Sequence, residues 1–89
     1  MLRDQQSIQD IWSAAQEILS FTAGMDYEAL VSDRRTQAAV LYEILIIGEA
    51  ANRLSPEFRS QHSTVPWKDI IGMQNIVVHQ CDQVDTEVI

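Results

Sequence analysis

The sequence predicts an all-α fold, a small helical bundle. Helix breakers are scarce, because the 89 residues include only three glycines and two prolines. Apolar residues recur at spacings of three and four over long stretches, and no segment alternates apolar and polar side chains as a half-buried strand would. We therefore expect a single helical domain that covers residues 1–89.

The first predicted helix begins near Asp4, which suits an N-cap, and ends at Gly24, which suits a helix exit. One apolar stripe runs along it at helical spacing. Its members are Ile8, Ile11, Trp12, Ala15, Ile18, Leu19 and Thr22. We interpret Trp12, like Trp67 further on, as an anchor of the hydrophobic core.

Residues 25–31 are predicted to form a connector with about one helical turn, after which Asp33 caps a second long helix. This helix extends to about Leu54 and is ended by Ser55 and Pro56. It is apolar around most of its circumference, a pattern typical of helices that are buried on more than one side. A domain of this size covers such a helix poorly on its own, so we expect a homodimer interface as the second cover.

The proline at position 56 can open a short helix that reaches about His62, for which we expect local packing or an interaction at the helix end. A linker over residues 63–66 follows, and another helix begins at Trp67. The apolar side of that helix is predicted to face the core. It consists of Ile70, Met73, Ile76 and Val77.

Charge and composition limit the classes of function. The net charge is −7, which disfavours strong binding to phosphate backbones unless basic residues gather locally. Arg53, Arg59 and Lys68 are the residues we expect to converge. The single cysteine, Cys81, excludes an intramolecular disulfide and fits a reducing cytoplasm. We expect a soluble cytoplasmic protein without signal sequence, membrane span, metal site or cofactor.

Many residues from about position 20 onward match, in order and spacing, a known pattern. They are Gln37 to Leu41, Ile46 to Ser55, Glu57, Arg59, His62, Val65 to Trp67, Ile70, Gly72, Met73, Asn75, His79, Val84 and Asp85. In this respect the chain resembles the HepT-like branch of the HEPN superfamily. The resemblance implies an antiparallel bundle of four to five helices that pairs as a two-fold dimer. Family members continue past Val84 and Asp85 into a further helix, so a bundle without its last helix is also an expectation.

The resemblance implies a function as well. Family members are metal-independent ribonucleases, which act as toxins of type VII toxin–antitoxin pairs and are held in check by a minimal nucleotidyltransferase. Their site combines an Arg, an adjacent polar residue, a His and, two positions later, a Tyr that the antitoxin can modify with AMP. The matching positions here are Gln74, Asn75, His79 and Cys81. Arg53 and Glu49 are candidate substrate-binding residues, with Glu49 expected at the dimer interface or cleft.

The motif thus differs from the family at two functional positions, with Gln74 in place of the Arg and Cys81 in place of the Tyr. In RNA cleavage without a metal, His79 would act as general acid or base, and Asn75 would donate a hydrogen bond to substrate. Gln74 has amide donors but lacks the positive charge of Arg. Loss of one preorganised donor lowers rates by roughly 10²–10³ in better-studied enzymes. We therefore expect a weakened or inactive ribonuclease.

Two further interpretations stay open at the level of sequence. The chain could be a non-catalytic dimeric module that binds a nucleotidyltransferase or another protein, which the acidic balance and the missing Arg favour. Binding of a small ligand between subunits has no sequence feature of its own. RNA stays a candidate partner, with weak affinity expected from the net charge.

Overall fold

The computed structural model describes residues 2–75, and within that range every regular element is a helix. The helices are α1 (Leu2–Phe21), α2 (Tyr27–Ser32), α3 (Arg34–Asn52) and α4 (Pro56–Gln61). A further helix begins at Trp67 and continues to residue 75 within the described range. The predicted all-α bundle is confirmed.

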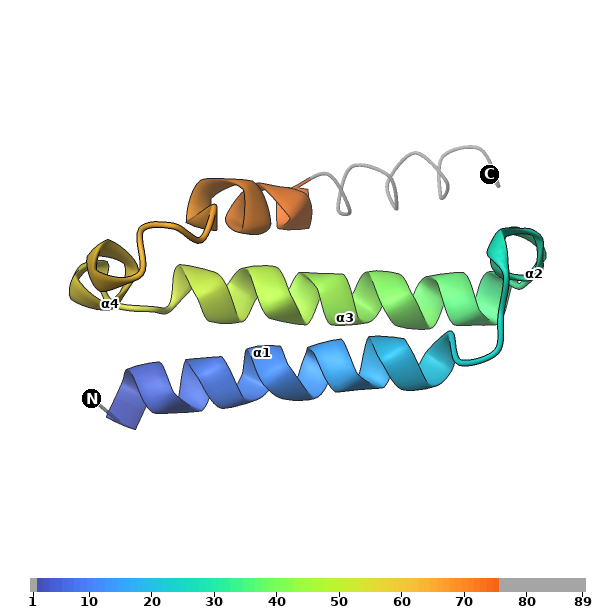
Figure 1. Ribbon diagram of the computed structural model, residues 1–89, viewed down its shortest axis with the longest axis horizontal. Coiled ribbons are helices and arrows are strands. Elements are labelled where there is room, and N and C mark those ends of the chain that lie inside the picture. Colours follow the sequence, from blue (N-terminus) through green and yellow to red (C-terminus); the bar gives the residue numbers. More distant parts are fainter. Residues whose placement is uncertain (1, 76–89) are drawn as a thin grey trace, which may run out of the picture.

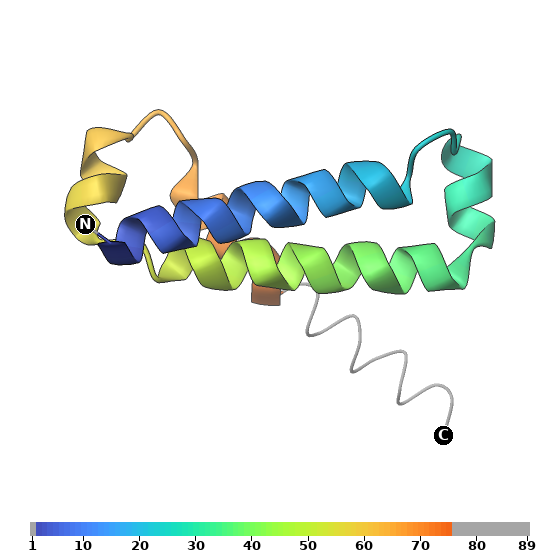
Figure 2. The same ribbon diagram turned by 90° about the horizontal axis from the view of Figure 1, so that it is seen from below.

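The two long helices, α1 and α3, lie side by side and antiparallel, joined by the short α2 at one end (Figures 1 and 2). At the other end α4 turns the chain back, so that the 67–75 helix lies against the opposite side of α3 from α1 (Figure 1). The prediction that the apolar second long helix is buried on more than one side is therefore confirmed, because α3 has a neighbour on each of two sides.

Local signals determine most helix boundaries. The Asp33 carboxylate caps α3 by accepting a hydrogen bond from the Thr36 backbone N–H at 3.1 Å, as the sequence predicts. Gly24 follows α1 with a φ of 76°, a left-handed conformation that glycine adopts without steric cost. Ser55 caps α4, and Pro56 occupies its first turn.

Small side chains are buried in both long helices. Ala14 of α1 is buried, as are Ala50 and Ala51 of α3, while the buried Gly48 of α3 faces the 67–75 helix. Small residues allow two helix backbones to come close, which increases van der Waals contact along the whole interface. Leu54, just past α3, is the largest of the fully buried side chains.

The buried side of α1 matches the predicted stripe only in part, because Ile11, Ala15, Ile18 and Thr22 of that stripe are half-buried. It runs through Asp4, Ser7 and Ala14, with the half-buried Ile11 and Ile18 between and after them. Three residues expected in the core are exposed instead: Ile8 by 37%, Trp12 by 60% and Leu19 by 64%. The prediction that Trp12 anchors the core is therefore wrong. The side with Asp4, Ser7 and Ala14 packs inward instead, and the hydrogen bonds from Asp4 to Ser55 hold it there.

Trp67 behaves differently and is half-buried at the start of its helix. Its ring meets Phe58 edge-on at a centroid distance of 6.2 Å, and Phe58 packs on His62 at 4.5 Å. The Trp67 indole N–H also donates to the His62 carbonyl at 3.0 Å. These contacts connect α4 to the next helix and confirm the packing role predicted for His62. Ile70 and Met73 are half-buried, whereas Ile76 and Val77 lie outside the described residues.

Candidate functional site

The motif helix, residues 67–75, contacts α3 at one very close point. A Cβ atom placed on Gly48 would lie 2.8 Å from Cβ of Gln74 and 3.6 Å from its Cα. No side chain larger than hydrogen fits at position 48 unless one helix moves. Gly48 thus fixes the depth at which Gln74, the residue at the family's Arg position, packs against the bundle.

This contact places two of the predicted site residues. Gln74 is half-buried, and its side-chain oxygen is also directed to the Gly48 region, 3.5 Å from where a Cβ atom on that glycine would lie. Asn75 is exposed. His79 and Cys81 lie outside the described residues, so the geometry between His79 and Gln74 stays a prediction.

Arg53 and Glu49, the predicted substrate-binding residues, lie on a different face of α3. Both line an open cleft of about 440 Å³ between α1 and α3, together with Asp10, Glu17 and Glu43. Glu49 is exposed and Arg53 pairs with Asp10 at 3.2 Å, while no residue of the 67–75 helix lines this cleft. Within residues 2–75 the structure therefore does not bring Arg53 and Glu49 into one pocket with Gln74.

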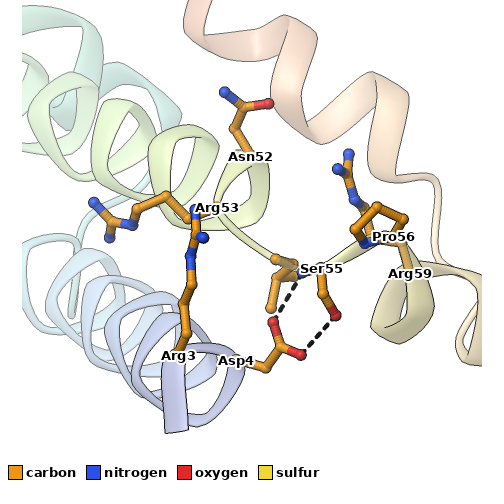
Figure 3. A pocket seen from close by; sticks show the side chains of 8 residues that line it. Arg3, Asp4, Asn52, Arg53, Ser55, Pro56 and Arg59 are labelled. Atoms are coloured by element: carbon orange, nitrogen blue, oxygen red, sulfur yellow. Dashed lines mark hydrogen bonds between the residues drawn. The ribbon is translucent and has the colours of Figure 1, made fainter. Parts of the chain in front are cut away.

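A second cleft, of about 380 Å³, lies where α1, the end of α3 and α4 meet (Figure 3). Arginines from all three elements line it: Arg3, Arg53 and Arg59. The sequence predicted that Arg53 and Arg59 converge with Lys68. The first two do line one cleft, although the Arg53 side chain points away from Arg59 (Figure 3) and pairs with Asp10. Arg3 takes the third place, because the fold returns α4 to the beginning of α1.

Asp4 holds this corner of the molecule together. It is only 5% exposed, and its two carboxylate oxygens accept hydrogen bonds from the Ser55 backbone N–H at 2.8 Å and from the Ser55 hydroxyl at 2.7 Å (Figure 3). The Ser55 hydroxyl in turn accepts the Phe58 N–H of α4. The prediction that Asp4 is an N-cap is wrong: it lies inside α1 and supports the cap of another helix.

These hydrogen bonds also set the ionisation of Asp4. The backbone N–H of Ser55, and then its hydroxyl, stabilise the charged carboxylate and lower the pKa of Asp4 below its usual value of 3.8. Asp4 is therefore negative at neutral pH. Ser55 donates a hydrogen bond to each Asp4 oxygen, so the Asp4 carboxylate is bound on the side that faces α4.

Metal-binding clusters and membrane-spanning helices are both absent from the described residues. Within residues 2–75, no group of three His, Cys, Asp or Glu side chains is arranged to hold a metal ion. No helix in the same range has both the length and the apolar character needed to cross a membrane.

Comparison with known proteins extends the picture to the rest of the chain. The family model described as "Ribonuclease HepT-like" matches residues 11–89. A protein of Methanocaldococcus jannaschii named as a candidate RNase is 33% identical over 76 residues, which are 85% of this chain and 70% of that protein. A protein of Thermococcus cleftensis named as a probable ribonuclease HepT is 32% identical over 82 residues, 92% of this chain and 74% of that protein.

A candidate RNase of Caldanaerobacter subterraneus is 34% identical over 73 residues, which are 82% of this chain and 65% of that protein. The chain thus spans about two thirds to three quarters of the length of these relatives. No solved structure matches the chain significantly.

Proposed function

We propose that this chain, which belongs to the HepT-like ribonuclease family, is a dimeric toxin-type ribonuclease subunit whose own RNA cleavage is weak. In this proposal His79 is the general acid or base, Asn75 donates a hydrogen bond to the substrate, and a nucleotidyltransferase is the antitoxin partner. The observation that carries it is the close packing of Gln74 on Gly48.

That packing matters because it positions residue 74 through its backbone and Cβ atoms. Gln and Arg both begin with an unbranched Cβ and Cγ, so an Arg at position 74 can keep the same contact with Gly48. The half-buried setting of Gln74 leaves the outer part of a longer side chain a way to solvent. The scaffold for the family's arginine is therefore retained, whereas its charge is absent.

The charge is the part that RNA cleavage needs. The transition state concentrates negative charge on the phosphate, and a guanidinium stabilises it with a fixed pair of donors and a full positive charge. The Gln74 amide offers two N–H donors and no charge. The wild-type chain is accordingly expected to cleave RNA slowly or below detection.

Restoring the arginine tests this proposal. We expect Gln74→Arg to raise the cleavage rate of a labelled single-stranded RNA by roughly 10²-fold, the order of magnitude lost when one preorganised donor is removed. Adding His79→Ala to Gln74→Arg should return the rate to background. Cleavage is measured on the purified full chain by gel electrophoresis, in the presence of EDTA.

A matched control adds the same charge elsewhere. Gln16 is exposed on α1, far along the chain from the motif, so Gln16→Arg should leave cleavage unchanged. Equal cleavage by the wild type and Gln74→Arg would refute the role assigned to position 74. The partner is checked separately, by co-purification with a small nucleotidyltransferase encoded in the neighbouring reading frame.

A non-catalytic interaction module is the second candidate function, and the cleft between α1 and α3 favours it. Four carboxylates line this cleft, from Asp10, Glu17, Glu43 and Glu49, against the single guanidinium of Arg53. Such a surface repels RNA and attracts a basic protein surface. Stable co-purification with the nucleotidyltransferase, combined with no cleavage by Gln74→Arg, would identify the chain as this kind of module.

A further inference from the structure

The cleft between α1, α3 and α4 is a concentration of positive charge in an acidic chain. Arg3 reaches it from α1, Arg53 from the C-cap of α3 and Arg59 from α4 (Figure 3). The chain as a whole has six basic residues against thirteen acidic ones. Half of its basic residues therefore line one cleft of about 380 Å³.

The acidic groups near this cleft compensate only part of the charge. Asp4 is the one acid among the residues that line it. It keeps its negative charge while Ser55 binds both of its oxygens, so it offsets one of the three positive charges. Asp10 pairs with Arg53, but the two side chains are 33% and 47% exposed, and exposed ion pairs contribute little. Within residues 2–75, Arg3 and Arg59 take part in no ion pair.

We propose that this arginine cleft binds a phosphodiester of the RNA backbone, and this proposal rests on the proposed function. Arginine is suited to that ligand because its planar fork donates two parallel hydrogen bonds to phosphate oxygens and keeps its charge at any physiological pH. The Asn52 side chain, which also lines the cleft, offers a neutral amide donor. Contacts of this kind position a nucleic-acid strand without reading its sequence.

The position of the cleft supports a role in holding substrate. Asn52 lies four residues after Gly48 on α3, so the two occupy the same side of the helix, about 6 Å apart along its axis. Gly48 is the residue against which Gln74 packs. One RNA strand can therefore contact the arginine cleft and the motif helix on adjoining parts of the molecule, in a way that the acidic α1–α3 cleft does not allow.

The experiment measures binding without cleavage. A fluorescently labelled 2′-O-methyl oligoribonucleotide, which lacks the attacking hydroxyl, is titrated with the full chain at several salt concentrations and followed by anisotropy. Arg3→Gln and Arg59→Gln should each weaken binding and reduce the slope of log K against log salt by about 0.7, the value for one contact to a single strand. Between 50 and 200 mM salt, each variant should therefore lose about threefold less affinity than the wild type.

Matched controls separate local from overall charge. Arg34→Gln removes one positive charge from an exposed position at the opposite end of α3 and should leave the slope unchanged. Arg59→Lys keeps the charge in α4 but loses the planar fork, so it should keep the slope of the wild type while binding more weakly. Circular dichroism of each variant checks that the helices persist, and Arg3→Gln, at an exposed side chain, gives a second measurement if Arg59→Gln disturbs α4.

Two sources of phosphate are distinguished by competition. Inorganic phosphate at constant ionic strength should displace the oligonucleotide only at far higher concentration than an unlabelled oligonucleotide of the same sequence. Binding of phosphate without binding of the oligonucleotide would overturn the proposal in favour of a small-anion site.

Equal slopes for Arg3→Gln, Arg59→Gln and Arg34→Gln would also overturn it. Neither outcome bears on the proposed function, because that depends on whether Gln74→Arg cleaves RNA.

Discussion

At the scale of single residues, Asp4 makes the hydrogen bonds with the largest sequence separation among the described residues. It binds the backbone and the hydroxyl of Ser55, which is 51 residues away in the sequence. Because Ser55 caps α4, a carboxylate in α1 supports the start of another helix. A substitution at position 4 is therefore expected to loosen α4 and the arginine cleft beside it.

The lowered pKa of Asp4 predicts how stability depends on pH. A group whose pKa is lower in the folded state stabilises that state above its unfolded pKa, here near 3.8, and the stabilisation is lost as pH falls through the folded value. We expect Asp4→Asn to lower the melting temperature at pH 7, and the difference from the wild type to shrink below pH 3.8. Thermal unfolding followed by circular dichroism at pH 7, 5 and 3 measures both.

A control for this prediction removes a carboxylate that has a weaker role. Asp10 is partly exposed, pairs with the exposed Arg53 and accepts a hydrogen bond from the exposed Gln6, so Asp10→Asn should change the melting temperature little at any pH. An Asp4→Asn variant as stable as Asp10→Asn at pH 7 would contradict the role of Asp4.

The sequence could not reveal this role. Asp4 stands at the start of a helical pattern, where aspartate usually caps its own helix, and nothing nearby indicates a partner in the second half of the chain. Trp12 shows the same limit. Its size and apolar ring favour burial, yet the neighbouring stripe with Ala14 packs against α3 and leaves Trp12 exposed by 60%.

At the scale of helices, the close contact between α3 and the 67–75 helix depends on the missing side chain at position 48. Gly48→Ala gains helix propensity of about 1 kcal/mol, but the added Cβ would lie 2.8 Å from Cβ of Gln74. Overpacking of this kind costs roughly 1–3 kcal/mol. Since the nearest obstacle is the Cβ of Gln74, which is fixed to the backbone and cannot swing aside, we expect a net loss of stability.

Gly72 offers the matched control for that prediction. It lies in the 67–75 helix, and among residues 2–75 an added Cβ would meet nothing within 4 Å. Gly72→Ala should therefore raise stability by up to about 1 kcal/mol through helix propensity alone. Urea unfolding curves measure both changes, and a Gly48→Ala variant as stable as Gly72→Ala would show that the helices can separate without cost.

Helix boundaries were the most predictable part of the fold, because their signals are local. Asp33 caps α3, Pro56 opens α4 and Trp67 begins the next helix, as the sequence indicates. The side of α1 that packs was not predictable, since two neighbouring stripes satisfy the helical period. Which side of α1 packs depends on the fit between its side chains and those of α3. The spacing of apolar residues carries no information on that fit.

At the scale of the whole molecule, an apolar surface of α1 stays uncovered by the described residues. Ile8, Trp12 and Leu19 are all exposed by more than a third and recur at helical spacing on one side of α1. Exposed apolar patches of this kind mark interaction surfaces. The homodimer in the proposed function gives them a partner.

Replacing two of these residues tests the dimer. We expect Trp12→Gln combined with Leu19→Gln to raise the dissociation constant of the dimer at least tenfold, because it removes most of the apolar surface that the partner would cover. Sedimentation equilibrium over a range of concentrations measures the constant. Tyr27→Gln, at a residue that is 80% exposed on α2, is the control and should not change it.

The candidate site was predictable to a different extent in each of its parts. The order of matched residues identified the family, and the substitution at Gln74 was visible in the sequence alone. The close approach to Gly48 was not, because glycine at position 48 suggests only that some close neighbour exists. Two residues of the arginine cleft, Arg53 and Arg59, could be predicted from the sequence. Arg3 could not, because it joins them only through the return of α4 to the start of α1.

The hydrogen bonds between Asp4 and Ser55 also have a consequence for the order in which the chain folds. Antiparallel α1 and α3 can pair once residue 52 has been made, but the corner that holds the arginine cleft closes only when Ser55 and the first turn of α4 are present. Contacts between residues far apart in sequence carry a larger loop-closure entropy and tend to form late. During synthesis, Asp4 can therefore form its hydrogen bonds only after more than half of the chain has been made. The arginine cleft is accordingly among the last parts of the described molecule to form.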